Sequence, residues 1–137
     1  MSPVVRAGAL CLIDADLLVV RRGAGPAGGT WDLPTVELRP GEALAEAAVR
    51  ACADLASLEV LCGPFLGWGE HPEAAQPTVE LYFEAVLLDP GNVSPQVPSG
   101  SAAAEARLVP IGEVIELRLA DGLAELLAEW GVIDTVV

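Results

Sequence analysis

The segment from residue 40 to residue 58, "PGEALAEAAVRACADLASL", constrains the fold most, because it predicts one amphipathic helix near the middle of the chain. Its apolar residues recur at spacings of three and four, which places them on a single helical face. They are Leu44, Ala47, Ala48, Ala51, Cys52 and Leu55. Such a face must be covered, so the helix is expected to pack on other elements of the chain.

Strands are predicted on both sides of this helix. Period-two alternation and β-branched content indicate strands at 3–12, 17–22, 31–38, 59–70 (broken by Gly-Pro), 78–88 and 105–111, with a second helix at 122–132. In the 78–88 strand, Val79, Leu81 and Phe83 alternate with polar residues and predict its apolar face. Asp121 is the expected N-cap of the second helix, and Gly131 its stop. This order predicts an α+β domain, an α/β/α sandwich with a mixed β-sheet flanked by helices.

The length and composition describe one folded domain. The chain has 137 residues, of which 53% are hydrophobic, so disorder is excluded and residues 1–137 are expected to form a single domain. No stretch of about 18 uncharged apolar residues predicts a membrane span. The start of the chain lacks the basic and apolar regions of a secretory signal. We therefore expect a cytoplasmic protein without membrane contact.

The charge pattern limits the partners. The formal net charge is −13 and the seven cationic residues are all arginines. Such a field repels polyphosphate backbones, so nucleic-acid binding is not expected. A small anionic ligand would need a local arginine or a metal ion. The three cysteines lack metal-site spacing and are expected to be buried reduced thiols.

The hydropathy pattern also suggests self-association and two mobile loops. A mean hydropathy of +0.49 with 20% charged residues leaves more apolar surface than one small domain hides, which predicts a homodimer. The Gly- and Pro-rich segments 23–30 and 89–103 are expected to be the most mobile. "GAGPAG" at 23–28 matches G-x-G-x-x-G but does not open a helix, so a mobile loop is favoured over a dinucleotide site.

The other face of the central helix holds Glu46, Arg50 and Asp54 four residues apart, with Glu42 at its entrance. Each pair at this spacing stabilises a helix by roughly a few tenths of a kcal/mol at most. The face could be a working acid cluster, the remnant of one, or an ordinary solvated surface.

Residues 29–60, "GTWDLPTVELRPGEALAEAAVRACADLASLEV", resemble the segment of Nudix hydrolases that carries the Nudix box, G-x5-E-x7-R-E-U-x-E-E-x-G-U, where U is a bulky aliphatic residue. Glu42 and Arg50 match its first glutamate and its arginine. Cys52 and Leu58 take aliphatic positions. The W-x-L-P before the box and "EARLVPIGEV" near the C-terminus also resemble the family. The resemblance implies the Nudix fold over nearly the whole chain.

The chain departs from the box where the family binds metal. Ala51, Asp54 and Leu55 stand at the three metal-binding glutamates, Val36 at the first glycine and Ser57 at the late one. The resemblance implies Mg²⁺ or Mn²⁺ as the cofactor, bound weakly if at all, with Asp54 as its ligand. Glu42, Arg50 and Asp54 would then be a catalytic remnant. The expected function is binding of a small nucleotide or phosphate ligand, with weak or no hydrolysis of nucleoside diphosphates linked to another moiety.

Two alternatives remain open. The first is an active hydrolase of ADP-ribose or nucleoside triphosphates, with Asp54 and a glutamate from outside the box. Candidates are Glu70, Glu73, Glu80, Glu84, Glu105 and Glu113. The second is an interaction protein without catalysis.

Some residues outside the box are candidates for ligand binding. The candidates are Trp31, Glu80 and Glu105. For the aromatic residues Trp31, Trp68 and Tyr82, however, core packing is favoured over ligand binding. His71, the only histidine, is expected to be an exposed loop residue rather than a general base.

Overall fold

The computed structural model describes residues 2–22, 29–72, 75–89, 91 and 94–134. Its elements are β1 Val4–Ile13, β2 Asp16–Arg22, β3 Trp31–Asp32, β4 Thr35–Glu37, α1 Leu44–Ala56, β5 Val60–His71, β6 Thr78–Leu87, β7 Ala103–Pro110, α2 Ile111–Val114 and α3 Leu123–Glu129. The short helix α2 was not predicted. The G-x-G-x-x-G match at 23–28 lies outside the described residues, as do parts of both loops predicted to be mobile.

The strands form one mixed sheet in the order β3-β2-β1-β6-β5, with β4 paired to β1 and β7 paired to β2. The first two strands form the predicted hairpin, in which Asp14 turns with φ 56°. The central pair, β1 and β6, is parallel and runs in register from Val4 and Thr78 onward. The other pairings are antiparallel. This parallel pairing brings side chains that are more than 70 residues apart in the sequence, such as Arg6 and Glu80, next to each other in the sheet.

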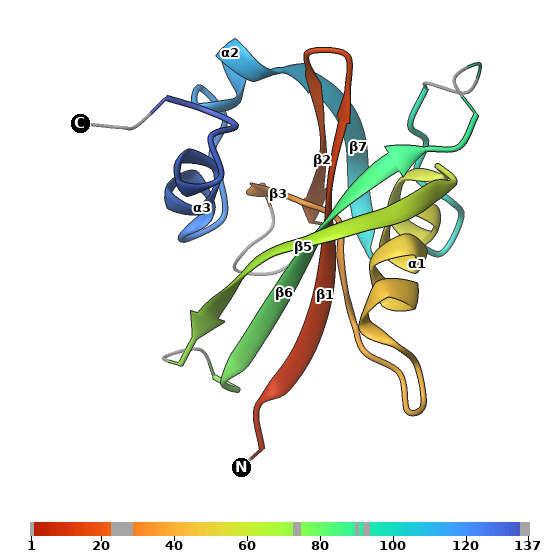
Figure 1. Cartoon of the computed structure of the whole chain (residues 1–137), viewed down its shortest axis with the longest axis vertical. Helices are drawn as coiled ribbons and strands as arrows, with labels where there is room; N and C mark the ends of the chain where they lie inside the picture. The colour runs from red at the N-terminus through yellow and green to blue at the C-terminus, as the bar shows by residue number, and fades with distance from the viewer. Residues whose placement is uncertain (1, 23–28, 73–74, 90, 92–93, 135–137) are drawn as a thin grey trace.

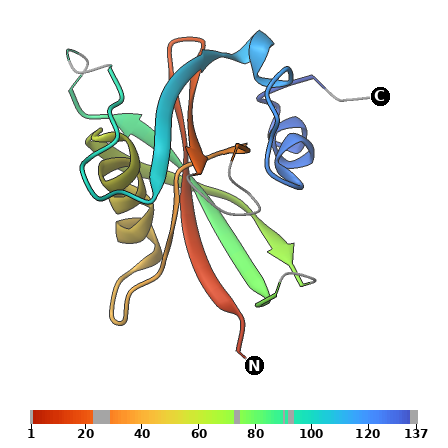
Figure 2. The same cartoon turned by 180° about the vertical axis from the view of Figure 1, so that it is seen from behind.

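Helices cover both faces of the sheet, as Figures 1 and 2 show, with α1 on one side and α2 and α3 on the other. Alternate residues of β1 divide between two cores. Ala9 and Cys11 pack beneath α1, whereas Leu10 packs in the cluster that contains Leu123 and Leu127 of α3. The predicted α/β/α sandwich is therefore confirmed.

The central helix buries the predicted stripe except for Leu44, which is half-buried. Its buried residues are Ala47, Ala48, Ala51, Cys52, Leu55 and Ala56. The helix ends at Ser57, which adopts the left-handed conformation with φ 57° and donates its N–H to the Ala53 carbonyl. This conformation costs a residue with a side chain roughly 1–2 kcal/mol. The Nudix box has a glycine at this position, and this chain forms the turn with a serine instead.

The predicted faces of β6 are wrong in its first half. Glu80 and Tyr82 are the buried residues, with 5% and 2% exposure, whereas Val79 and Leu81 are half-buried. The alternation was detected correctly, but polar side chains occupy the inner face because they find partners there. The paired strand β5 continues through Gly63-Pro64 and absorbs the break as shifts in register.

The expected N-cap of the second helix is also wrong. Gly122, with φ 83°, takes that position in α3, and no side chain caps the helix. A left-handed glycine turns the chain into the helix, so Asp121 lies one residue too early. Gly131 ends the last turn as expected, with φ 75°.

Two further predictions concern cysteines and membranes. All three cysteines are free, with Cys11 and Cys52 buried as predicted and Cys62 half-buried. No helix in the described ranges combines the length and the apolar character that a membrane crossing needs.

Candidate functional site

Glu42, which precedes α1, comes together with Arg50 and Asp54 along one side of that helix. Arg50 donates through Nε to Glu42 Oε2 at 2.8 Å and through Nη2 to Glu42 Oε1 at 2.9 Å. It also donates to the Glu37 carbonyl at 2.9 Å and to Asp54 Oδ2 at 3.2 Å. We call this group the Arg50 clasp. Its bidentate hydrogen bonds lower the pKa of Glu42 to about 2.

The side of α1 that faces the sheet is apolar. Ala51 is fully buried, and Leu55 is 8% exposed. Leu55 packs in a small cluster with Val20 and Ala103. Asp54 lines a depression of about 400 Å³ beside the loop that leads to β7, and no other described residue lining it is ionisable.

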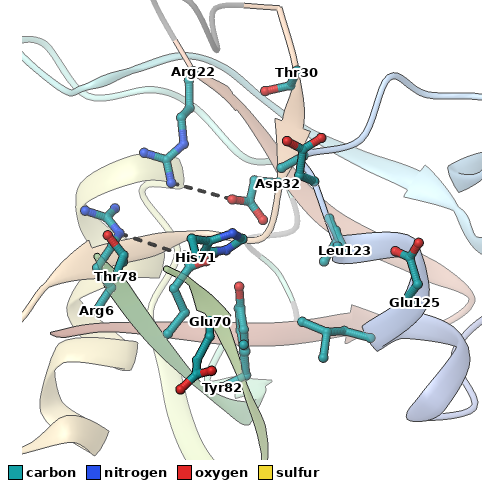
Figure 3. A pocket seen from close by; sticks show the side chains of 16 residues that line it. Arg6, Arg22, Thr30, Asp32, Glu70, His71, Thr78, Tyr82, Leu123 and Glu125 are labelled. Carbon is teal, nitrogen blue, oxygen red and sulfur yellow. Dashed lines mark hydrogen bonds and ion pairs between the residues drawn. The ribbon is translucent and has the colours of Figure 1, made fainter. Parts of the chain in front are cut away.

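The main cavity lies on the opposite side of the sheet from α1, against α3. Its volume is about 530 Å³, which is within the range of small-molecule sites. The cationic or titratable bases that line it are Arg6, Arg22 and His71. The carboxylates are Asp32, Glu70, Glu80, Asp121 and Glu125. Figure 3 shows the two arginines on one side and Leu123 and Glu125 of α3 opposite them.

Five polar residues that line this cavity and the neighbouring Thr35 form what we call the buried charge cluster: Arg6, Arg22, Asp32, Thr35, Glu80 and His71. Arg6 and Arg22 each donate through Nη2 to Thr35 Oγ1 at 3.1 Å. Two ion pairs follow, Arg22 Nη2 to Asp32 Oδ2 at 3.5 Å and Arg6 Nε to Glu80 Oε2 at 3.9 Å. His71 Nε2 lies 2.7 Å from Glu80 Oε1.

Burial shifts the pKa values of several groups in and beside this cluster. Burial raises the pKa of Asp32 to about 6, and repulsion from Glu80 adds to the effect against the attraction of Arg22. Burial also raises the pKa of the Tyr82 phenol far above its ordinary value. The pKa of Arg6 is lowered, first by burial and then by the nearby Arg22. Two guanidinium groups are therefore held close together in a partly desolvated place.

The family model of the NUDIX domain matches residues 2–130. The chain belongs to the Nudix family. A search of curated proteins by sequence finds no match.

Solved Nudix structures share its fold at low identity. A NUDIX hydrolase from Nitrosomonas europaea is 22% identical, with a TM-score of 0.78 over 93% of this chain and 69% of its own. A MutT NUDIX hydrolase from Burkholderia pseudomallei is 19% identical, with a TM-score of 0.79 over 93% of this chain and 97% of its own. The NUDIX domain of Shewanella oneidensis NrtR, solved with ADP ribose, is 18% identical, with a TM-score of 0.76 over 96% and 87%.

Nudix hydrolases generally use divalent metal ions such as Mg²⁺ or Mn²⁺. The box face of this Nudix chain carries fewer oxygen ligands for such an ion than the box glutamates would provide. Ala51 and Leu55 offer no oxygen, and Asp54 is bonded to Arg50. Across the described ranges, no three His, Cys, Asp or Glu side chains are grouped so that they could hold a metal ion.

The other predicted site residues are dispersed in the Nudix fold. Trp31 is buried in the core beneath Arg107, whose guanidinium carbon lies 4.8 Å from the ring centroid. Glu105 lies on β7, where it pairs with Arg21 and Arg107. Neither Trp31 nor Glu105 lines the main cavity, whereas Glu80 does.

The remaining candidates differ in position. Of the other glutamates considered for a relocated site, Glu70 lines the cavity, Glu84 and Glu113 are exposed, and Glu73 lies outside the described residues. The expectation of an exposed loop His71 is wrong, because His71 ends β5 and contacts Glu80.

Sequence reasoning missed Arg6, Arg22, Asp32 and Thr35. A usable signal was present, since Arg6 and Glu80 are charged residues inside strands that are otherwise rich in apolar residues. Charges at such positions indicate pairing across the sheet. The pairing partner was not evident because β1 and β6 are far apart in the sequence.

Proposed function

We propose that this Nudix protein binds a small nucleotide or another phosphate-containing ligand and hydrolyses it weakly or not at all with Mg²⁺ or Mn²⁺. The observation that carries the proposal is the packing of Leu55 against Val20 and Ala103. An apolar cluster occupies the place where the Nudix box presents a metal-binding glutamate. The remaining box acids, Glu42 and Asp54, serve the Arg50 clasp.

Ligand binding is supported by the main cavity. Its volume is about 530 Å³, and it combines two arginines with a buried tyrosine, Tyr82. Arginine forks suit phosphate oxygens, and the carboxylates suit sugar hydroxyls or base N–H groups. The NrtR domain of similar fold was solved with ADP ribose, which makes that nucleotide a suitable first probe.

The test pairs a binding and a turnover measurement. Calorimetry with ADP-ribose should show binding, and release of AMP at millimolar Mg²⁺ should stay far below that of a Nudix hydrolase with an intact box. The double variant Ala51→Glu, Leu55→Glu should bind Mg²⁺ more tightly, because it restores two carboxylates to the box face.

One result would contradict the proposal and favour a relocated catalytic site. That result is turnover by the unmodified protein of about 1 s⁻¹ or more, the lower end of typical kcat values, that is lost in Asp54→Ala. Absence of binding by ADP-ribose and by nucleoside triphosphates would instead favour a pure interaction protein.

We also infer that the protein forms a homodimer. Several large apolar side chains on β5 and β6 are exposed, with Leu61 at 59%, Trp68 at 56% and Val86 at 62%. The strand β5 is also at one end of the sheet order, where its outer edge can accept a partner. Sedimentation at micromolar concentration should show a dimer, and finding only the 14.1 kDa species would contradict this inference.

A further inference from the structure

A second, smaller cavity adjoins the buried charge cluster. Its volume is about 240 Å³, and it shares Arg6 and Arg22 with the main cavity. Its apolar walls include Val20, Leu33 and Leu55. None of the described residues that line it carries a carboxylate, whereas five carboxylates line the main cavity. The same two guanidinium groups therefore border an acidic cavity and a cavity whose only charges are their own.

We propose that this second cavity holds a phosphate group of the ligand directly on Arg6 and Arg22, without a divalent cation. This inference rests on the proposed function, since it assigns one group of the ligand to one part of the site. The remainder of the ligand, rich in hydrogen-bond donors, would extend past the arginines into the acidic main cavity.

The two arginines are already aimed at a common point. Arg6 donates through Nη2 to both the carbonyl and the hydroxyl of Thr35, at 3.0 and 3.1 Å, and Arg22 donates to the same hydroxyl. One threonine thus fixes both guanidinium groups before a ligand arrives. Preorganised arginine forks match the oxygen geometry of a phosphate group.

One donor of the cluster is also unpaired. Arg6 Nε is buried and, within the described part of the chain, has no hydrogen-bond partner, because its nearest carboxylate oxygen, on Glu80, is 3.9 Å away. Unsatisfied buried donors are rare in folded proteins. Arg6 and Arg22 also lie close enough to repel each other. A bound phosphate would relieve that repulsion.

Leu55 explains why no metal is required. A glutamate at this position, as in the Nudix box, would place a carboxylate in the wall of the second cavity, and a cation would be needed between it and a phosphate. Leu55 removes the repulsion and lines the cavity with apolar surface. Low polarity around a charged hydrogen bond strengthens it.

The experiment measures binding of inorganic pyrophosphate and of ADP-ribose to the full chain by calorimetry in EDTA. Both probes should bind, and Arg22→Gln should weaken each by about tenfold or more, in line with the loss of a charged hydrogen bond. Arg39→Gln is the matched control, because it removes the same charge from an exposed residue outside both cavities. Arg39→Gln should change either affinity by less than about twofold, because salt screens the effect of distant surface charges.

A second pair of variants tests the role of Leu55. In EDTA, Leu55→Glu should weaken pyrophosphate binding, and added Mg²⁺ should restore part of it. Leu55→Gln has the same length without the charge and should retain most of the binding. Circular dichroism melts confirm that each variant is folded, and Arg22→Gln provides an independent answer if either Leu55 variant is not.

The outcomes separate this inference from the proposed function. Binding that requires Mg²⁺ in the unmodified protein, or equal affinities of Arg22→Gln and Arg39→Gln, would overturn the inference even if no hydrolysis is found. Rapid hydrolysis with Mg²⁺, together with arginine-dependent binding in EDTA, would overturn the proposed function and leave the phosphate site intact.

Discussion

The Arg50 clasp and the buried charge cluster are both built from arginine and carboxylate, yet their physical states are opposite. In the clasp, nitrogen and oxygen are 2.8–2.9 Å apart in a bidentate pair, and the pKa of Glu42 falls to about 2. In the cluster, the ion pairs are longer, at 3.5 and 3.9 Å, and burial of the Asp32 carboxyl raises its pKa to about 6. Tightly paired charges hold a loop on a helix, whereas perturbed charges beside a cavity are the kind that functional sites use.

The largest expected effect distinguishes the two regions by pH. The carboxyl of Asp32 has a pKa of about 6 in the fold and 3.8 as its ordinary value. Between these values the folded state binds a proton that the unfolded chain lacks, so the free energy of unfolding rises as pH falls from 6 to 4, by up to about 3 kcal/mol. Asp32→Asn should remove this rise. The measurement is urea unfolding at several pH values.

Asp121→Asn is the control for that experiment, because Asp121 also lines the main cavity but is exposed. It should leave the slope between pH 6 and 4 unchanged. If Asp32→Asn retains the slope of the unmodified protein, burial in the cluster does not raise the pKa of Asp32 as expected.

The second effect is a steric clash next to the buried charge cluster, away from the Arg50 clasp. A Cβ atom on Gly8 would lie 2.6 Å from Thr35 Cγ2 and 2.9 Å from Tyr82 Cδ1. Gly8→Ala should therefore destabilise the protein by about 2 kcal/mol, as overpacking does, and should weaken binding of ADP-ribose through the displaced Thr35. Gly112→Ala, where the new Cβ meets nothing within 4 Å, is the matched control for denaturant unfolding. Equal stability of the two variants would contradict the tight packing around Gly8.

The smallest effect concerns the clasp. Because the pKa of Glu42 is lowered from 4.5 to about 2, its contribution to stability is complete above pH 4.5 and is lost as pH falls through 2. Glu42→Gln should be less stable than the unmodified protein at pH 7 and should lose less stability on acidification. Thermal melts from pH 7 to 2 measure this. Asp54→Asn, at a half-exposed pair, should change stability by at most about 0.5 kcal/mol, and a larger effect than that of Glu42→Gln would contradict the clasp geometry.

Periodicity in the sequence was sufficient for most of the fold. The hairpin around Asp14, the stripe of α1 and the strands β6 and β7 were all predicted, since local patterns determine such elements. The Arg50 clasp was also accessible, because Glu42 and Arg50 are near each other in the sequence and match a known spacing.

The buried charge cluster was not accessible in the same way. It depends on the parallel pairing of β1 with β6, which aligns Arg6 with Glu80, and local pattern does not encode that register. The first half of β6 also violates the rule that polar residues face outward, because Glu80 and Tyr82 are buried and line the main cavity. Departures of this kind are expected at functional sites.

Arg6 and Arg22 border both cavities, and we therefore expect ligand binding in one cavity to affect binding in the other. An anion in the small cavity would draw the guanidinium charge toward itself and leave Asp32 and Glu80 more able to accept donors in the large one. Linkage requires that the two ligands change each other's affinity by the same factor. Pyrophosphate in the small cavity and a free nucleoside in the large one should therefore bind cooperatively. The only side chains that the two ligands would share are those of Arg6 and Arg22.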